Sequence, residues 1–313
     1  MHSLDPKQTR MLTVVVPVYN EEGGLPALLA ELIPACHAGA WDLVLVDDGS
    51  KDNSLALLQQ AGSEPGVTVL RHKVNRGYGG ALKTGLLAAH TPYVVTIDAD
   101  GQHDLNDVGR LLKFAEEQDA DLVVGDRGKQ DRASPYRRAG KWLIRKFAGL
   151  LMPIHISDLN SGFKLYRTEL VQGYLHLCPD SMAFSDVITL IFIKKRHLVL
   201  QQSITIKQRT SGSSTINTFT AIQTVLEILN ITMLFNPLRI FLPLSLVCIG
   251  FGFAWGIPIM LRQRGVSVGA MLGIVTGLLF FFIGLIAEQL SEMRLGMLDR
   301  TSENDKADHE GSH

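Results

Sequence analysis

Two long stretches near the end of the chain contain no charged residue, and they limit the possible folds more than any other feature. Ile240–Leu261 and Val266–Ala287 each hold 22 residues. At a rise of about 1.5 Å per residue, each helix would span roughly 33 Å, which is enough to cross the hydrocarbon core of a bilayer. Only Arg262-Gln-Arg-Gly265 separates them, so the sequence predicts a transmembrane hairpin within residues 237–290. A buried helical hairpin of a soluble protein is the alternative.

An apolar stripe precedes the hairpin, between residues 216 and 236. Its members recur at intervals of three and four, which is the period of an amphipathic helix: Phe219, Ile222, Leu226, Leu229 and Met233. We expect this helix to lie on the membrane surface, with packing against the preceding domain as the alternative. Residues 291–313 form a polar tail, and we expect Thr301–His313 to be disordered.

The chain from residue 11 to residue 215 alternates between strand and helix patterns. Starting with a strand, the predicted elements are Thr13–Tyr19, Leu25–Ala38, Asp42–Val46, Asp52–Ala61, Val67–Arg71, Gly80–Ala89, Tyr93–Ile97, Leu105–Glu117 and Asp121–Val124. This order implies an α/β fold with a mostly parallel sheet and helices on both faces. Residues 1–10 are expected to be an N-terminal tail without a signal peptide, because the first apolar run is short and leads into Pro17.

Charge and cysteine content exclude some classes of function. The net charge of −1 and the pI of about 6.8 provide no basic field for nucleic acid. The three cysteines, Cys36, Cys178 and Cys248, lie far apart in the sequence, with neither metal-site spacing nor a disulfide framework. This usage fits a reducing compartment.

Polar clusters follow four of the predicted strands. They are Pro17-Val-Tyr-Asn-Glu-Glu22, Asp47-Asp-Gly-Ser50, Asp98-Ala-Asp100 and Gly125-Asp-Arg127. Open α/β sheets bind ligands beyond the carboxyl ends of their strands. Four clusters converging on one edge therefore predict a ligand site there.

The carboxylates of Asp98 and Asp100 follow a buried strand and are two residues apart, so in extended chain they point to the same side. A further step of two reaches Gln102. Two close carboxylates repel each other unless a cation lies between them, and hard oxygen ligands suit Mg²⁺ or Mn²⁺ carrying a diphosphate. The alternative is a helix N-terminus capped by Asp100 or Asp104.

Three other segments keep two interpretations each. Asp47–Ser50 is either only a turn or places Asp48 where it accepts hydrogen bonds from a nucleobase. Tyr19 and Glu21 are either loop surface residues or bracket the base and ribose. Asn75-Arg-Gly-Tyr-Gly-Gly80 is either a phosphate cradle at a helix start or a glycine run that lets the helix pack closely on the sheet, which we favour slightly.

Several of these segments together resemble one known family. Besides Pro17–Glu21, Val46–Ser50, Asn75–Ala81 and Asp98–Gln102, they include Val124-Gly-Asp-Arg127, Asp158-Leu-Asn-Ser-Gly-Phe-Lys164 and Arg209-Thr-Ser-Gly-Ser-Ser214. The set resembles the family 2 glycosyltransferases of the GT-A fold. Within them it is most similar to the polyprenyl-phosphate glycosyltransferases, the group that contains dolichol-phosphate mannose synthase. The resemblance covers about residues 11 to 240.

The resemblance implies roles for the matching residues. A nucleotide sugar would be bound by Pro17, Tyr19, Glu21, Asp48, Asp98, Ala99 and Gln102, and a metal ion, Mg²⁺ or Mn²⁺, by Asp98, Asp100 and Gln102. The acceptor phosphate would be bound by Arg127, Arg137 (or Arg138), Arg209 and Ser214. The residues expected to carry catalysis are Asp100, Asp158, Arg127 and Arg209.

Two acidic positions remain open. Asp158 would orient the acceptor, act as a base, or only cap the Ser-Gly turn that follows it. Ser185-Asp186-Val187 stands where many relatives carry a Glu-Ile pair before an apolar helix. Asp186 is a candidate to substitute for that Glu, but we leave it out of the catalytic set.

The activity implied is transfer of a hexose, UDP-linked by expectation, to a polyprenyl phosphate such as undecaprenyl phosphate, with inversion. Arg262 and Arg264 oppose Arg239, Arg294 and Arg300, so flanking charges do not orient the hairpin. Because nucleotide sugars are expected in the cytoplasm, we place the catalytic domain on the cytoplasmic side of the cell inner membrane. Relatives also suggest a homo-oligomer, a tetramer.

Two other functions compete with this one. A processive polysaccharide synthase would share the catalytic fold, but the Gln-x-x-Arg-Trp motif of such enzymes is absent from the sequence. A membrane-anchored nucleotide-sugar binder without catalysis is the third hypothesis, and loss of Asp98 or Asp100 would have favoured it.

Overall fold

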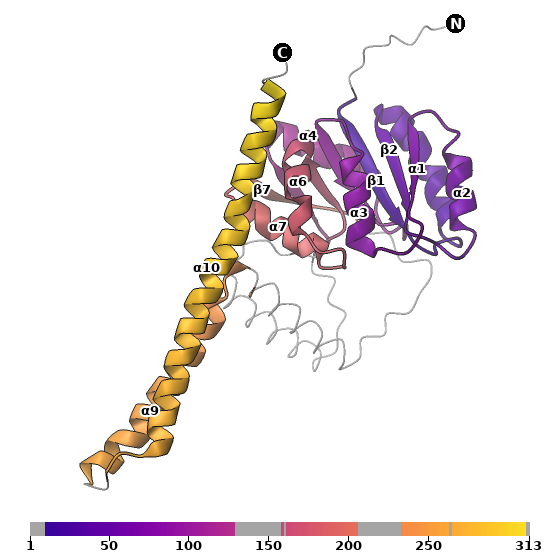
Figure 1. The fold of residues 1–313 in the computed structure, drawn as a ribbon. Coiled ribbons are helices and arrows are strands. Elements are labelled where there is room, and N and C mark those ends of the chain that lie inside the picture. Colours follow the sequence, from indigo (N-terminus) through magenta and orange to yellow (C-terminus); the bar gives the residue numbers. More distant parts are fainter. Residues whose placement is uncertain are drawn as a thin grey trace, which may run out of the picture. The chain divides into compact units, whose positions relative to one another are not determined.

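A seven-stranded sheet forms the centre of the larger unit of the protein (Figure 1). The computed structural model describes residues 10–128, 158–159, 161–205, 233, 235–262 and 265–310, with side chains up to residue 293. The strands are β1 Leu12–Val18, β2 Asp42–Asp47, β3 Val67–Arg71, β4 Tyr93–Thr96, β5 Leu122–Asp126, β6 Lys164–Arg167 and β7 Val199–Ser203. The chain divides into two compact units, and the sheet belongs to the one formed by residues 1–131 and 155–214.

The strand order is β3-β2-β1-β4-β6-β5-β7, and all strand pairs are parallel except those of β6 with β4 and β5. The helices of this unit are α1 Leu25–Gly39, α2 Ser54–Ala61, α3 Tyr78–Leu87, α4 Asn106–Gln118, α6 Thr168–Tyr174 and α7 Phe184–Lys194, with a 3₁₀ turn at Leu175–Leu177. The predicted α/β fold with a mostly parallel sheet is therefore confirmed. The elements of this unit that follow β5 were not predicted from the sequence.

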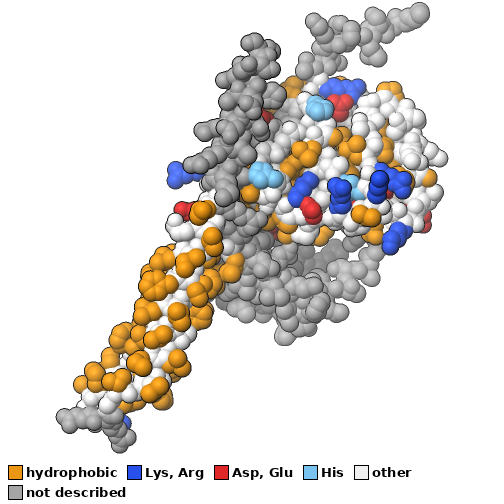
Figure 2. Space-filling view, viewed as in Figure 1, with side chains coloured by type: hydrophobic (Ala, Val, Ile, Leu, Met, Phe, Trp, Pro, Cys, Tyr) orange, Lys and Arg blue, Asp and Glu red, His pale blue; other side chains and the backbone are white. Residues whose placement is uncertain are grey.

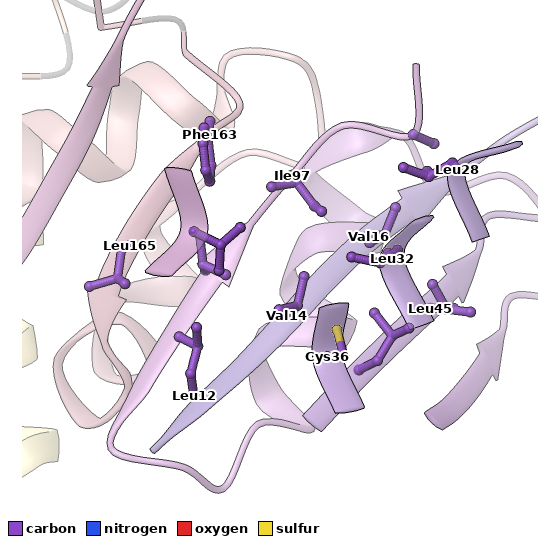
Figure 3. Close-up of a cluster of buried hydrophobic side chains, with 14 of the residues drawn as sticks. Leu12, Val14, Val16, Leu28, Leu32, Cys36, Leu45, Ile97, Phe163 and Leu165 are labelled. Carbon is purple, nitrogen blue, oxygen red and sulfur yellow. The ribbon is translucent and has the colours of Figure 1, made fainter. Parts of the chain in front are cut away.

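Strand β1 lies at the middle of the core, and all seven of its residues are buried. Val14 and Val16 pack with Leu32 and Cys36 of helix α1 in one cluster (Figure 3). Val15 points to the opposite face and lies against Gly85 of helix α3. Burial on both faces explains why β1 is a continuous apolar run rather than an alternating one.

Helix α3 approaches the sheet closely because Gly85 has no side chain. A Cβ at this position would overlap the side chain of Val15 and lie 3.1 Å from Cγ2 of Val46. The glycine is thus needed for helix-to-sheet packing rather than for backbone flexibility.

The smaller unit contains two long apolar helices, α9 Leu238–Leu261 and α10 Val268–Glu310. Both are long and apolar enough to cross a membrane, with mean hydropathy of 2.1 and 2.5 over their most apolar windows. Only 11% and 17% of those windows are buried, and hydrophobic side chains cover the described hairpin surface (Figure 2). This exposure is not that of a soluble core, so the transmembrane interpretation is favoured over a buried hairpin.

Glycines let the two hairpin helices approach each other. A Cβ at Gly252 would lie 2.9 Å from the Ala270 carbonyl oxygen, and one at Gly277 would lie 2.9 Å from the Ser245 carbonyl oxygen. Small residues at helix contacts are the usual means of close packing in a bilayer.

Two expectations about the C-terminal third have different outcomes. Helix α10 continues to Glu310, so the prediction that residues 301–313 are disordered is wrong for 301–310. The amphipathic stripe falls mostly on residues outside the described ranges, and only Met233, which is exposed, is described. Its placement on the membrane surface stays a prediction.

Replacing Gly85 with valine tests the packing of α3 on the sheet. We expect Gly85→Val to destabilise the protein by about 1–3 kcal/mol, because the added atoms overlap two well-packed valines. Gly173→Ala in helix α6 is the matched control, since a Cβ there meets nothing within 4 Å and alanine favours a helix. Thermal denaturation followed by circular dichroism in detergent would measure both. Equal melting temperatures for the two variants would contradict the packing argument.

Candidate functional site

The carboxyl ends of β1, β2, β4 and β5 meet at one edge of the sheet because these strands run in the same direction. The antiparallel strand β6 begins at this edge, where Lys164 pairs with Thr96 and Val124. The segments that follow these strands are the polar clusters seen in the sequence. The structure therefore brings the four clusters together within one unit.

The loops after β1 and β2 are joined by hydrogen bonds between backbone and side chains. The Asn20 amide donates to Ser50 Oγ at 3.1 Å, and the Lys51 amide donates to Asn20 Oδ1 at 2.8 Å. The Glu21 amide donates to Ser54 Oγ at 2.9 Å. These bonds hold the backbone directly after Tyr19, whose own side chain is 41% exposed. The ring is available to a ligand, and Pro17, two residues earlier in the chain, is buried in β1.

Asp48 is buried, and backbone amides surround its carboxylate. Its two oxygens accept the amides of Arg76 at 2.8 Å and Gly77 at 2.9 Å. His72, also buried, places Nδ1 2.7 Å from Asp48 and Nε2 2.8 Å from Thr84 Oγ1. Asp48 therefore fixes the glycine-rich segment to the end of β2, and only its remaining lone pairs can reach a nucleobase.

The glycine-rich start of α3 does not form an open phosphate cradle. Its first amides already bind the Asp48 carboxylate, and the Gly80 amide donates to the Asp180 carbonyl at 3.2 Å. A Cβ at Gly79 would lie 2.8 Å from the Ser181 carbonyl oxygen. The structure favours the packing interpretation, with the 179–181 loop as an additional partner that the sequence did not predict.

Asp98 receives contacts from two residues that the sequence pattern did not single out. The Tyr78 hydroxyl donates to Asp98 Oδ1 at 2.8 Å, and His103 Nε2 lies 3.6 Å from Oδ2. Burial by itself would raise the pKa of Asp98, but the interactions with His103 and Tyr78 outweigh it, so the pKa is lowered. Asp98 is therefore ionised near neutral pH. A Cβ at Gly162 would overlap its carboxylate, so a glycine is required there.

Asp100 and Gln102 lie in the turn that follows Asp98. The Gln102 amide donates to Asp100 Oδ1 at 3.1 Å, and Ala99 between the two aspartates is buried. The predicted alternative of a helix capped by Asp100 or Asp104 is not what the structure shows, because the N-cap of α4 is Leu105 and makes no side-chain capping bond. Asp104, one residue earlier, accepts the amide of Asn106 at 3.0 Å. Asp100 is thus not used as a cap for this helix.

The chemical types of the donors in this turn suit a divalent cation that also binds a ligand. No group of three His, Cys, Asp or Glu side chains gathers as a metal site in the described ranges. A cation would instead take the carboxylates of Asp98 and Asp100 and the amide oxygen of Gln102, with further oxygens from the ligand. Mg²⁺ and Mn²⁺ are commonly held by one or two carboxylates together with phosphate oxygens in this way.

Arg127 and Asp158 form a two-pronged ion pair at the end of β5. Arg127 Nε lies 2.6 Å from Asp158 Oδ2, and Nη2 lies 2.8 Å from Oδ1. The bond to Asp158 raises the pKa of Arg127, which stays charged. Both residues were expected in the site from their motifs, but their binding to each other was not predicted.

The remaining predicted acceptor residues, Arg137, Arg209 and Ser214, lie outside the described residues. The sequence analysis gave no individual role to five residues that contact the site. They are Tyr78, His72, His103, Gly162 and Lys164. Of these five, only His103 could have been assigned to the site from its position in the sequence, since it directly follows Gln102.

The sequence matches two family models. The model described as glycosyl transferase family 2 covers residues 13–175, and the model described as GtrB C-terminal hairpin covers residues 236–293. The first match covers the elements from β1 to α6, and the second covers α9 and the first part of α10.

Curated relatives match over most of the chain. An undecaprenyl-phosphate 4-deoxy-4-formamido-L-arabinose transferase of Aeromonas hydrophila is 29% identical over 283 residues, which is 88% of this chain and 85% of that protein. The protein of the same name from Photorhabdus laumondii is 30% identical over 285 residues, or 89% and 86%.

Solved structures with the same fold are more distant in sequence. Glucosyl-3-phosphoglycerate synthase from Mycobacterium tuberculosis in complex with phosphoglyceric acid has a TM-score of 0.56 at 20% identity, covering 71% of this chain and 80% of that one. Its complex with Mn²⁺, UDP and phosphoglyceric acid has a TM-score of 0.55 at 21% identity, covering 71% and 78%. At such identity the likeness shows the fold alone.

Removing the Asp48 carboxylate should loosen the start of α3. In Asp48→Ala the Arg76 amide loses its carboxylate acceptor and the Gly77 amide keeps only Asn75 Oδ1, and a hydrogen bond to a charged group contributes about 1.5–3 kcal/mol. We expect hydrogen exchange at these two amides to accelerate by about tenfold or more. Asp52→Ala, which removes an amide acceptor from the neighbouring loop, should leave them unchanged. Mass-spectrometric hydrogen exchange would show it, and undiminished protection in Asp48→Ala would refute this role.

Proposed function

Since this chain belongs to glycosyl transferase family 2, we propose that it transfers a hexose from a UDP-sugar to a polyprenyl phosphate such as undecaprenyl phosphate, with inversion. The observation that carries the proposal is the edge of the sheet in the larger unit. It holds a paired-carboxylate turn, Asp98 to Gln102, beside an anion-binding side chain, Arg127, in a chain that also has two apolar helices. The names of the curated relatives, and the UDP and Mn²⁺ bound to one structural neighbour, support it.

The donor would bind where the loops after β1 and β2 meet. Tyr19 offers an exposed ring for the base, with Pro17 two residues earlier in the chain, while Glu21 and Asp48 accept hydrogen bonds from the nucleoside. The hydrogen bonds that Ser50 Oγ and Ser54 Oγ accept from the Asn20 and Glu21 amides hold this loop before the ligand arrives, which limits the ordering cost on binding.

Asp98, Asp100 and Gln102 would hold Mg²⁺ or Mn²⁺ together with the diphosphate, next to Ala99. When bound, such a cation neutralises charge that develops on the departing nucleoside diphosphate. Tyr78 and His103 orient the Asp98 carboxylate toward that position.

The acceptor phosphate would bind Arg127, with Arg137, Arg209 and Ser214 completing the pocket. A phosphate oxygen is already anionic near neutral pH, so attack on the anomeric carbon needs no strong general base. Asp158 has both oxygens on the Arg127 guanidinium, which supports an orienting role over a basic one. Catalysis then rests on positioning and on fixed charges.

The apolar helices supply the reason for a lipid acceptor. A polyprenyl chain stays in the bilayer, so the enzyme that uses its phosphate has to be held at the membrane surface. We place the protein in the cell inner membrane with the catalytic unit on the cytoplasmic side, as a homo-oligomer, and the stripe from Phe219 to Met233 on the membrane surface.

Transfer assays with a panel of donors test the proposal. Purified protein is mixed with labelled UDP- and GDP-sugars, Mn²⁺ and vesicles containing undecaprenyl phosphate. We expect label in the lipid fraction with at least one UDP-sugar. Lipid-linked single sugars support this function, long polymers would indicate a processive synthase, and nucleotide binding without transfer would indicate a binding protein.

Asp100→Asn tests the paired carboxylates. We expect the variant to keep its melting temperature, because Asp100 lies in a partly exposed turn, and to lose transfer by about 100-fold or more through weakened metal binding. Asp104→Asn is the control and should stay within about twofold of the wild-type rate. An Asp100→Asn enzyme that turns over normally at limiting Mn²⁺ would remove this residue from the site.

Gly162→Ala tests the placement of Asp98 without changing any polar group. The added methyl overlaps the carboxylate, so Asp98 has to move away from Tyr78 and His103. We expect UDP binding in the presence of Mn²⁺ to weaken by roughly tenfold, measured by calorimetry. Gly23→Ala, where a Cβ meets nothing within 4 Å, should bind like the wild type. Equal affinities in both variants would show that Asp98 tolerates displacement.

A further inference from the structure

Lys164 is the first residue of β6 and is completely buried at the edge where the site lies. It pairs with Thr96 of β4 on one side and Val124 of β5 on the other. A lysine is almost never fully buried unless its charge is compensated. The roles proposed above do not use this residue.

The Lys164 ammonium binds three acceptors on two different segments. Nζ lies 2.6 Å from the Leu159 carbonyl oxygen and 2.8 Å from Thr189 Oγ1, and it also donates to the Ser185 carbonyl. Leu159 belongs to the turn that follows Asp158, while Ser185 and Thr189 lie in helix α7. One side chain therefore ties the turn to the helix.

These contacts require the charged form of the lysine. Carbonyl oxygens only accept, and the Thr189 hydroxyl already gives its proton to the Ser185 carbonyl at 2.9 Å. All three partners of Nζ are thus acceptors, and only an ammonium has three N–H groups. Burial lowers the pKa of Lys164, while the charges of Asp186 and Asp158 oppose this change.

The turn held by Lys164 carries the partner of Arg127. Asp158 immediately precedes Leu159, and its two carboxylate oxygens accept the Arg127 guanidinium. A series of contacts therefore runs from helix α7 through Lys164 and the Leu159 carbonyl to Asp158 and Arg127. On the nucleoside side of the edge, the Asp48 carboxylate binds the 76–77 backbone, and Lys164 takes no part in these bonds.

We propose that Lys164 is a positioning residue for the acceptor side of the site, holding the 158–159 turn so that Asp158 aims Arg127 at the acceptor phosphate. The link to the acceptor phosphate rests on the proposed function. The anchoring of the turn by the Lys164 ammonium does not depend on that function.

The matched variants are at Thr189, because they alter one of the three acceptors and leave the lysine in place. Thr189→Val removes the hydroxyl at nearly constant volume, and Thr189→Ser keeps it. Lys164→Met removes all three donors at similar length, and Lys113→Met, on the exposed side of α4, is its control. Since Lys164→Met takes the lysine donor from the Leu159 carbonyl and places an uncharged side chain at a completely buried polar position, it risks misfolding, and the Thr189 pair keeps the test decisive.

Two readouts are measured on the full-length protein. The first is hydrogen exchange of the segment 158–163, compared with the segment 75–77. The second is steady-state transfer with varied undecaprenyl phosphate, beside calorimetric binding of UDP with Mn²⁺. We expect Thr189→Val to speed exchange in 158–163 and to raise the acceptor KM or lower kcat by roughly tenfold. UDP affinity should stay within about twofold, Thr189→Ser should match the wild type, and Lys164→Met should show the larger defect.

The possible outcomes distinguish the anchoring of the 158–159 turn by Lys164 from its effect on acceptor use. Unchanged exchange in 158–163 for Thr189→Val and for folded Lys164→Met would overturn the anchoring role of Lys164. Faster exchange with an unaltered acceptor dependence would overturn its link to the acceptor. A parallel loss of UDP affinity would indicate general destabilisation instead, which also overturns the proposal. A wild-type protein that transfers no sugar from any donor would sink the proposed function, while the exchange data would still decide the anchoring.

Discussion

Parallel hydrogen bonding of β1 to β2 and β4 brings the segments that follow Val18, Asp47 and Thr96 to one edge of the sheet. Every part of the site in the larger unit depends on that alignment, because Val18 and Asp47 are 29 positions apart in the chain and Asp47 and Thr96 are 49 apart. The alignment in turn depends on burial of β1 on both faces, with Val14 and Val16 against α1 and Val15 against α3. A shift of one residue in β1 would exchange these faces and move the polar loops away from the edge.

At this edge the structure compensates buried charge with neighbours that are themselves held in place. Asp48 accepts backbone amides and lies beside His72, Asp98 accepts the Tyr78 hydroxyl and lies beside His103, and Arg127 donates to Asp158. Hydrogen bonds to charged groups are stronger than neutral ones, so each of these side chains has a preferred position before a ligand arrives. Such preorganisation suits a reaction whose rate depends on placing a phosphate oxygen and a leaving diphosphate rather than on proton transfer.

The two units meet different physical demands. The larger one buries apolar surface between a sheet and its helices, whereas the helices of the smaller one leave their apolar side chains exposed and contact each other through glycines. Within a bilayer there is little hydrophobic gain from joining helices, so close backbone approach at Gly252 and Gly277 supplies the packing. A membrane anchor of this kind and a lipid acceptor are consistent with each other.

The sequence by itself predicted the elements of the first half, the parallel sheet, the apolar hairpin, the family and the polar clusters at the strand ends. These features depend on local periodicity and on short motifs, which are readable without contacts. For the same reason β6 was missed. It has only four residues and runs antiparallel between β4 and β5, so nothing in its own pattern distinguishes it.

Only the tertiary structure decided which side chains are partners. Tyr78, at the start of a helix twenty residues earlier in the chain, donates to Asp98. Asp158 binds Arg127, which we expected to bind phosphate. Lys164 binds both the 158–159 turn and helix α7, which are far apart in the sequence. The polar tail was expected to be disordered, yet α10 continues through it to Glu310. Side-chain pairing depends on distances between elements, and those distances exist only once the sheet has brought the strand ends to a common edge.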